Sequence, residues 1–117
     1  KEEVNVNKRA YDYILELVAR NPNRFYPSES GDYQGEVWGK IDGEKIFIIK
    51  SVFDREMGYA GFNSSAFLSW SKRVGLSATS QNRRTISARI GGMVTTCACI
   101  YKSFESQLEE VQENVPF

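Results

Sequence analysis

The chain has 117 residues, of which 15 are basic and 15 acidic, so its net charge is zero at neutral pH. This length suits a single domain over residues 1–117, and a hydrophobic content of 41% excludes a disordered tail. Histidine is absent, which excludes His-dependent triads and HExxH zinc sites. No apolar run approaches the ~20 residues of a membrane span, and the pattern of a signal peptide is lacking. The start at Lys1, without a methionine, indicates a piece of a longer protein.

The first elements expected are a helix and a loop. Apolar residues recur with helical spacing over residues 8–20, and Asn21-Pro22 ends the pattern. Phe25 lies just beyond this stop and is expected to fill the core. Proline and glycine among polar residues predict an exposed loop over residues 26–35.

A β-hairpin is predicted next. Two strand-like runs, residues 37–41 and 44–49, flank Asp42-Gly43, which is the preferred dipeptide of a two-residue type I′ turn. This turn sets a register that pairs residues across the strands, Trp38 with Phe47 and Val37 with Ile48.

Two short helices with a tight turn between them follow the hairpin. Ser51 and Asp54 have the spacing of a capping box at the start of the first helix. Gly61 is a typical C-terminal stop, and Asn63 is a good N-cap for a second helix that extends to Val74. Helices joined this closely form a helix-turn-helix.

The last predicted core element is a second hairpin. Residues 86–90 alternate in polarity, Gly91-Gly92 makes a turn, and residues 93–101 form the returning strand. The order helix, hairpin, helix, helix, hairpin predicts an α+β winged helix with an extra N-terminal β-hairpin. Its core spans residues 8–102, and residues 103–117 are expected to add an acidic C-terminal helix or tail.

Charge is distributed unevenly along this chain. No acidic residue lies between Glu56 and Glu105, whereas six cations do, so the remainder of the chain is acidic. One sign of charge gathered in one part of a neutral protein points to a polyanionic partner. The six cations fall on the helix pair and the second hairpin: Lys72, Arg73, Arg83, Arg84, Arg89 and Lys102.

The second helix of the pair has a predicted apolar side and a predicted polar side. At 100° per residue the apolar side contains Ala66, Phe67, Trp70 and Val74, flanked by Leu68 and Arg73. Small hydroxyls and cations allow close approach to a major groove and bond base edges or phosphate. The groove-facing candidates are Ser64, Ser65, Ser69, Lys72 and Arg73. The alternative for these residues is an ordinary solvated helix face.

Adjacent arginines at the start of the second hairpin are further candidates. Arg83 and Arg84 follow two amide side chains, and guanidinium groups bind phosphate bidentately. Arg89, near the Gly-Gly turn, belongs to the same patch. About five phosphate contacts predict weak, salt-dependent binding of duplex or forked DNA. The alternative is an exposed arginine pair without measurable effect.

The sequence offers no pattern typical of a metal site, a cofactor site or a catalytic site. Cys97 and Cys99 share one face of a predicted strand, where unpaired cysteines act as small core hydrophobes. Structural zinc takes four ligands and no other cysteine or histidine exists, so no metal or cofactor is expected. No nucleophile has a neighbouring base, which indicates a non-enzyme. Reduced cysteines favour a cytoplasmic location.

Several motifs together resemble a known family, over roughly residues 8–102. They are Trp38-Gly39-Lys40-Ile41, Ser51-Val52-Phe53, Gly61-Phe62-Asn63, Trp70, Gly75-Leu76, Arg84-Thr85-Ile86 and Arg89-Ile90-Gly91-Gly92. The pattern resembles the C-terminal winged-helix region of helicase-like ATPases of mobile genetic elements. That family includes the MCM-like helicases of staphylococcal cassette chromosomes, and was first catalogued as a domain of unknown function. The resemblance implies an accessory DNA-binding module whose partners are DNA and the rest of a parent helicase, with the ATPase motifs outside this chain.

A protein-interaction or oligomerisation module is the rival interpretation. Winged helices also serve as docking domains, and the acidic residues 103–113 are able to pack over the basic patch of the same or a neighbouring subunit. The patch would then be an internal salt-bridging surface rather than a DNA site. Whether the acidic segment covers Arg83 and Arg84 distinguishes the two interpretations.

Overall fold

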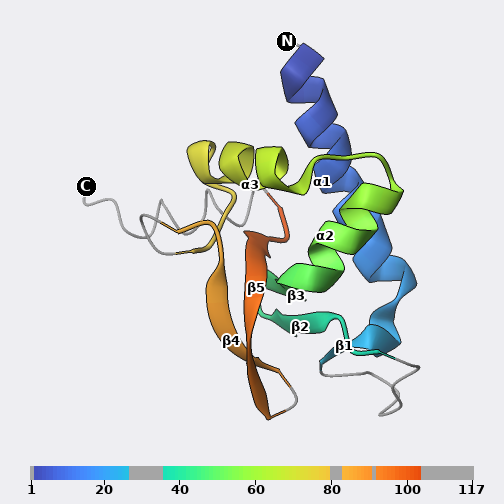
Figure 1. Ribbon diagram of the computed structural model, residues 1–117, viewed down its shortest axis with the longest axis vertical. Coiled ribbons are helices and arrows are strands. Elements are labelled where there is room, and N and C mark those ends of the chain that lie inside the picture. Colours follow the sequence, from blue (N-terminus) through green and yellow to red (C-terminus); the bar gives the residue numbers. More distant parts are fainter. Residues whose placement is uncertain (1, 27–35, 80–82, 91, 104–117) are drawn as a thin grey trace.

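Three helices pack against a five-stranded sheet in the computed structural model, which describes residues 2–26, 36–79, 83–90 and 92–103 (Figure 1). The helical elements are α1 (Glu2–Arg20), the short 3₁₀ helix η1 (Pro22–Arg24), α2 (Lys50–Tyr59) and α3 (Ser64–Arg73). The strands are β1 (Phe25–Tyr26), β2 (Gly39–Asp42), β3 (Lys45–Ile49), β4 (Ile86–Ile90) and β5 (Met93–Tyr101). The predicted order of helices and hairpins is thus observed. The expected loop beyond Tyr26 and the expected C-terminal helix lie outside the described residues.

Both hairpins join into one sheet of order β1-β2-β3-β5-β4. All neighbours are antiparallel except β1 and β2, which are parallel. The central contact is between β3 and β5, whose paired residues include Phe47 with Cys99 and Ile49 with Cys97. In Figure 1 the β4–β5 hairpin extends away from the helices toward its turn. The parallel strand β1 was not predicted, because a two-residue strand carries no periodicity.

The sheet has apolar residues on both faces. Alternate residues of a strand point to opposite sides, so Ile46 and Ile48 enter the helix-covered core while Phe47 enters a second cluster. The same alternation separates Ile100 from Cys99 in β5. Phe25 is 1% exposed and belongs to the helix-covered core, as predicted. The middle of β3 and the second half of β5, from Cys97 to Ile100, are therefore buried on both sides, which explains their continuous apolar runs.

The predicted register of the first hairpin is wrong by two residues. Phe47 faces Lys40 instead of Trp38, and Ile48 faces Gly39 instead of Val37. The turn consists of Gly43-Glu44, with Gly43 at a φ of 61°, rather than Asp42-Gly43. A shift of two residues keeps each side chain on its predicted face, so the hydrophobic pattern alone does not detect the error.

The helix-turn-helix is confirmed, but one predicted cap is not. The helix α2 begins at Lys50 with Ile49 as its N-cap and no side-chain capping bond, so the proposed capping box of Ser51 and Asp54 is wrong. At the second helix the prediction holds, because the Asn63 side chain accepts a hydrogen bond from the Ala66 amide at 2.9 Å. The turn between them contains Gly61 at a φ of 83°, which suits glycine.

The helix α3 is rotated relative to the predicted faces. Its buried residues are Phe67, Leu68, Trp70 and Ser71. Leu68, predicted at a flank, is only 2% exposed, whereas Val74, predicted in the core, is 40% exposed. Val74 lies outside the helix as its C-cap, so the 100° spacing no longer applies to it. Ala66 is exposed as well. The remaining surface of α3 is lined by small side chains and ends in basic residues.

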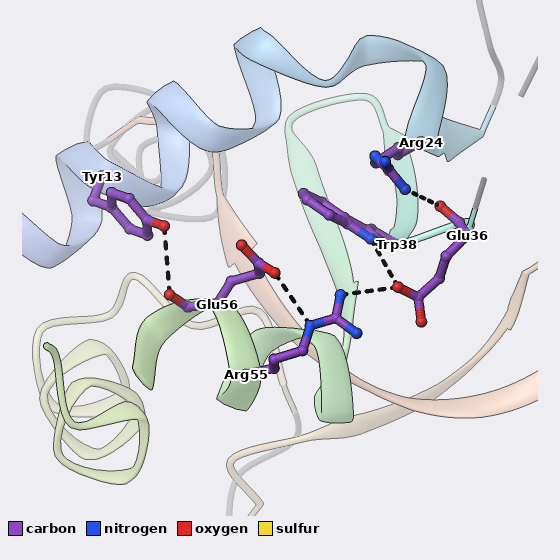
Figure 2. Close-up of polar contacts among 6 residues, drawn as sticks. All are labelled: Tyr13, Arg24, Glu36, Trp38, Arg55 and Glu56. Atoms are coloured by element: carbon purple, nitrogen blue, oxygen red, sulfur yellow. Dashed lines mark hydrogen bonds and ion pairs between the residues drawn. The ribbon is translucent and has the colours of Figure 1, made fainter. Parts of the chain in front are cut away.

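A polar cluster fixes α2 against the start of β2 (Figure 2). The Glu36 carboxylate accepts hydrogen bonds from Arg55 Nη2 at 2.9 Å and from the Trp38 indole at 3.2 Å. The hydrogen bond from Arg55 lowers the pKa of Glu36. The Arg24 guanidinium lies 4.6 Å from the Trp38 ring centroid. Trp38 is 8% exposed and Trp70 is 6% exposed, so both serve packing rather than base stacking.

The two cysteines are free and buried, as predicted. Burial raises the pKa of Cys97 to about 11 and that of Cys99 to about 12. Both thiols therefore remain protonated at neutral pH and pack as small apolar groups. No cluster of metal-ligating side chains was found in the described ranges.

Candidate nucleic-acid interface

Arg84 joins the segment before β4 to the exposed side of α3. Its Nη1 atom donates to Ser65 Oγ at 3.1 Å and to Ser69 Oγ at 3.0 Å, with a longer contact of 3.4 Å to the Ser65 carbonyl oxygen. Three of the predicted site residues, two on one face of α3 and the third 15 residues beyond Ser69, thus form one polar surface. The serine hydroxyls position a guanidinium group above the helix.

The segment after α3 is pinned to β5 by its backbone. The Ala78 amide donates to Cys99, and the Tyr101 amide donates to Leu76. Lys72 Nζ then donates to both the carbonyl oxygen and the hydroxyl of Thr79, each at 3.0 Å. Lys72, predicted to face a groove, is therefore half-buried and holds this segment in place.

The hydrogen bonds that begin at Lys72 extend through Thr79 to the arginine pair. Thr79 Oγ1 donates to the Arg83 carbonyl oxygen at 2.6 Å, so the backbone at Arg83 is fixed while its side chain is exposed. The two amide residues before the pair, Gln81 and Asn82, lie outside the described residues. The position of the arginine pair thus depends on Lys72 and Thr79, which act through the backbone.

Ser64, predicted to face a groove, instead connects the two helices of the helix-turn-helix through its side chain. Its hydroxyl donates to Asp54 Oδ1 at 2.7 Å, and Lys50 Nζ contacts Asp54 Oδ2 at 2.6 Å. Burial raises the pKa of Asp54, but the hydrogen bonds from Lys50 and Ser64 outweigh it and leave the pKa below its ordinary value. Asp54 is therefore ionised at neutral pH and orients Lys50.

A polar cavity of about 400 Å³ opens beside this surface. Its lining residues come from the start of α2, from α3 and from the segment before β4: Lys50, Ser65, Leu68, Arg83, Arg84 and Thr85. Lys50 was not among the predicted site residues. It follows the first hairpin directly and lies outside the acid-free stretch, so no sequence signal linked it to the arginine pair.

Arg73 and Arg89 flank this cluster, Arg73 one helical turn beyond Ser69 on α3 and Arg89 further along β4. Arg73 is exposed in the last turn of α3. Arg89 is exposed on β4 and donates to the Gly92 carbonyl oxygen at 3.3 Å, near the turn of the hairpin. At about 3.3 Å per strand residue, Arg89 is roughly 16 Å along the chain from Arg84. The structure therefore does not bring it into contact with the residues around α3.

Lys50 is paired with the Asp54 carboxylate, whereas the four arginines of this surface form no ion pair within the described part of the chain. The ion pairs there lie on α1 and around α2: Arg20 with Glu16, Lys50 with Asp54, and Arg55 with Glu36 and Glu56. None of them includes Arg73, Arg83, Arg84 or Arg89. Whether residues 104–117 cover the arginine pair is a question outside the described residues.

The α2–α3 pair, with its tight glycine turn and the cations beside its second helix, defines a helix-turn-helix domain, a class that suggests DNA binding. The chain belongs to the family described as the Cch helix turn helix domain, whose model matches residues 5–110. No curated protein and no solved structure matches the chain significantly. Over the described residues, no helix is both long and apolar enough to cross a membrane.

Proposed function

We propose that the chain is a winged helix that binds duplex or forked DNA. In this proposal α3 is the recognition helix and the β4–β5 hairpin is the wing. The pairing of β3 with β5, and of β5 with β4, supports this assignment because it places a three-stranded sheet beside the helix-turn-helix. The β4–β5 hairpin extends beyond the helices (Figure 1).

The observation that carries the proposal is the bridge from Arg84 to Ser65 and Ser69. It aligns the exposed side of α3 with the base of the wing, so that one duplex is able to contact both. Ser65 and Ser69 are small enough for close approach to a groove, and Arg83 and Arg84 supply charge for the flanking backbone. Arg73 and Arg89 extend the positive surface in both directions.

The wider role proposed for the domain rests on the family resemblance of its motifs. We propose that it is an accessory module of a replication-type helicase from a mobile genetic element, and that the module itself performs no catalysis. Weak binding by one copy suits such a role. When several copies in an oligomeric motor bind the same DNA, the high effective concentration of each one raises the overall affinity.

Fluorescence anisotropy with labelled single-stranded, duplex and forked DNA tests the proposal. We expect salt-sensitive binding of duplex or forked DNA that is weakened in Arg83→Ala/Arg84→Ala. The matched control is Lys8→Ala/Arg9→Ala, which removes two adjacent exposed cations from α1. Absence of binding by the wild-type chain at low salt, or equal losses in both double variants, would contradict the proposal.

A protein-interaction role is the second candidate, and the exposed apolar start of β5 favours it. Met93 is 73% exposed and Val94 64% exposed at the start of β5. Beside Met93 lies an apolar cavity of about 310 Å³ that also involves Tyr26, Val37, Ile49 and Ile90. Light scattering over a range of concentrations tests this role: a stable dimer that Met93→Asp disrupts would support it, and a monomer throughout would exclude self-association.

A further inference from the structure

We propose that the cavity between Lys50, Arg83 and Arg84 is a phosphate-binding pocket that takes one phosphate group of the nucleic-acid backbone. This assignment rests on the proposed DNA-binding function and adds a defined contact to it. It also gives a ligand-binding role to Lys50, which lies on α2, outside the recognition helix and the wing.

The chemistry of the lining supports an oxyanion. Three cationic groups, from Lys50, Arg83 and Arg84, border the cavity, and hydroxyls of Ser65 and Thr85 complete its polar surface. No carboxylate lines it. Ammonium and guanidinium groups donate hydrogen bonds without accepting them, and hydroxyls do both. A site composed in this way favours an acceptor with several oxygens and negative charge, which describes a phosphate group.

The size of the cavity suits a phosphodiester rather than a bare ion alone. The cavity has a volume of about 400 Å³ and is open to solvent on one side. A phosphate group with an attached sugar and bridging waters fits this space. Leu68 provides an apolar lining residue against which the non-polar part of a sugar can rest.

Two of the donors are held in position before a ligand arrives. Arg84 is fixed to α3 through Nη1, which leaves its Nε and Nη2 groups for a phosphate. Lys50 is held by Asp54, whereas Thr79 fixes only the backbone of Arg83 and leaves its exposed guanidinium to turn toward a ligand. Preorganised donors bind with a smaller loss of conformational freedom. Because the lining residues come from three segments, one phosphate in this pocket would fix the start of α2, α3 and the wing base relative to the duplex.

Two experiments with Lys50→Ala test the pocket, with Lys8→Ala as the matched control. In the first, inorganic phosphate is titrated by NMR against chloride at equal ionic strength. We expect saturable shifts at residues 50, 65 and 83–85 that Lys50→Ala weakens. In the second, DNA affinity is measured on native duplexes and on duplexes with single neutral methylphosphonates at successive positions.

The DNA experiment identifies the phosphate that occupies the pocket. On native duplex, Lys50→Ala should lose about 10-fold in affinity. At one methylphosphonate position the wild-type chain should lose a similar amount, and Lys50→Ala should lose nothing further. Such coupling at a single position supports a backbone phosphate.

The remaining outcomes separate the pocket from the proposed function. Normal DNA binding by Lys50→Ala, without saturable phosphate shifts in the wild-type chain, overturns the pocket and leaves the DNA-binding function intact. Saturable phosphate binding in a chain that binds no DNA supports an oxyanion pocket for free phosphate and overturns the DNA function. Thermal melting of Lys50→Ala in parallel excludes unfolding as the cause of any loss.

Discussion

Arg84→Ala is the substitution that most directly tests the proposed interface. In the free protein this substitution removes only the contacts of an exposed side chain with two serines. Such surface substitutions usually change the free energy of unfolding by no more than about 0.5 kcal/mol. For a domain of this size that corresponds to a shift in Tm of about 2–4 °C or less. In the complex it removes a charged hydrogen-bonded contact of about 1.5–3 kcal/mol, or roughly 10- to 150-fold in Kd.

The assay is fluorescence anisotropy with labelled duplex at several salt concentrations, together with thermal melting. The slope of log K against log salt should fall in magnitude by about 0.9 if Arg84 neutralises one phosphate. Arg84→Lys keeps the charge and should keep the slope. It should still bind more weakly than wild type, because one ammonium lacks the planar fork that contacts serine and phosphate together.

A double-mutant cycle between Arg84 and Ser69 separates anchoring from direct base contact. If Ser69 acts by anchoring the guanidinium, Ser69→Ala should cost little once Arg84→Ala is present. If Ser69 contacts a base directly, the two losses should add. Unchanged DNA affinity and salt slope in Arg84→Ala would refute the proposed role of the bridge, and a Tm loss above about 10 °C would show that the residue is mainly structural.

Three further predictions concern the fold. Gly39→Ala should prevent stable folding, because a Cβ there would lie 1.8 Å from a carbonyl oxygen of β3; a cooperative melt close to that of wild type would contradict this. Asn63→Ala should cost about 1 kcal/mol of unfolding free energy in urea, since the Ala66 amide loses its cap, and Asn63→Asp should retain most of it. The raised pKa values of Cys97 and Cys99 should stabilise the fold fully below pH 9, and this contribution should fall as pH rises toward 11–12, because the unfolded thiols ionise first. The variant Cys97→Ala/Cys99→Ala lacks both thiols, so its free energy of unfolding should fall less between pH 7 and alkaline pH than that of the wild-type chain. An equal fall in both chains would contradict the prediction.

Local patterns predicted the elements of this fold well, and pairing over distance poorly. The Asn63 cap and the two cysteines behave as expected because each depends on neighbours within a few residues. The register of the first hairpin was wrong because two registers keep the same faces, and only the turn at Gly43-Glu44 distinguishes them. The contact of β3 with β5 joins segments about fifty residues apart, which no periodicity encodes.

The candidate site was also predicted only in part: residue type identified some of its members, but not which cations contact each other or the cavity. Charge and residue type selected Ser65, Ser69 and Arg84, and the structure brings these three together. The same criteria placed Lys72 in the groove-facing set, although it holds the segment before β4. They also missed Lys50, the first residue of α2, which lines the cavity. The role of each cation depends on what surrounds it. Lys72 binds the carbonyl and hydroxyl of Thr79, Arg84 binds two serine hydroxyls, and Lys50 borders a cavity. Lys72 should therefore affect DNA affinity only through the position of the arginine pair, whereas Lys50 should affect it directly.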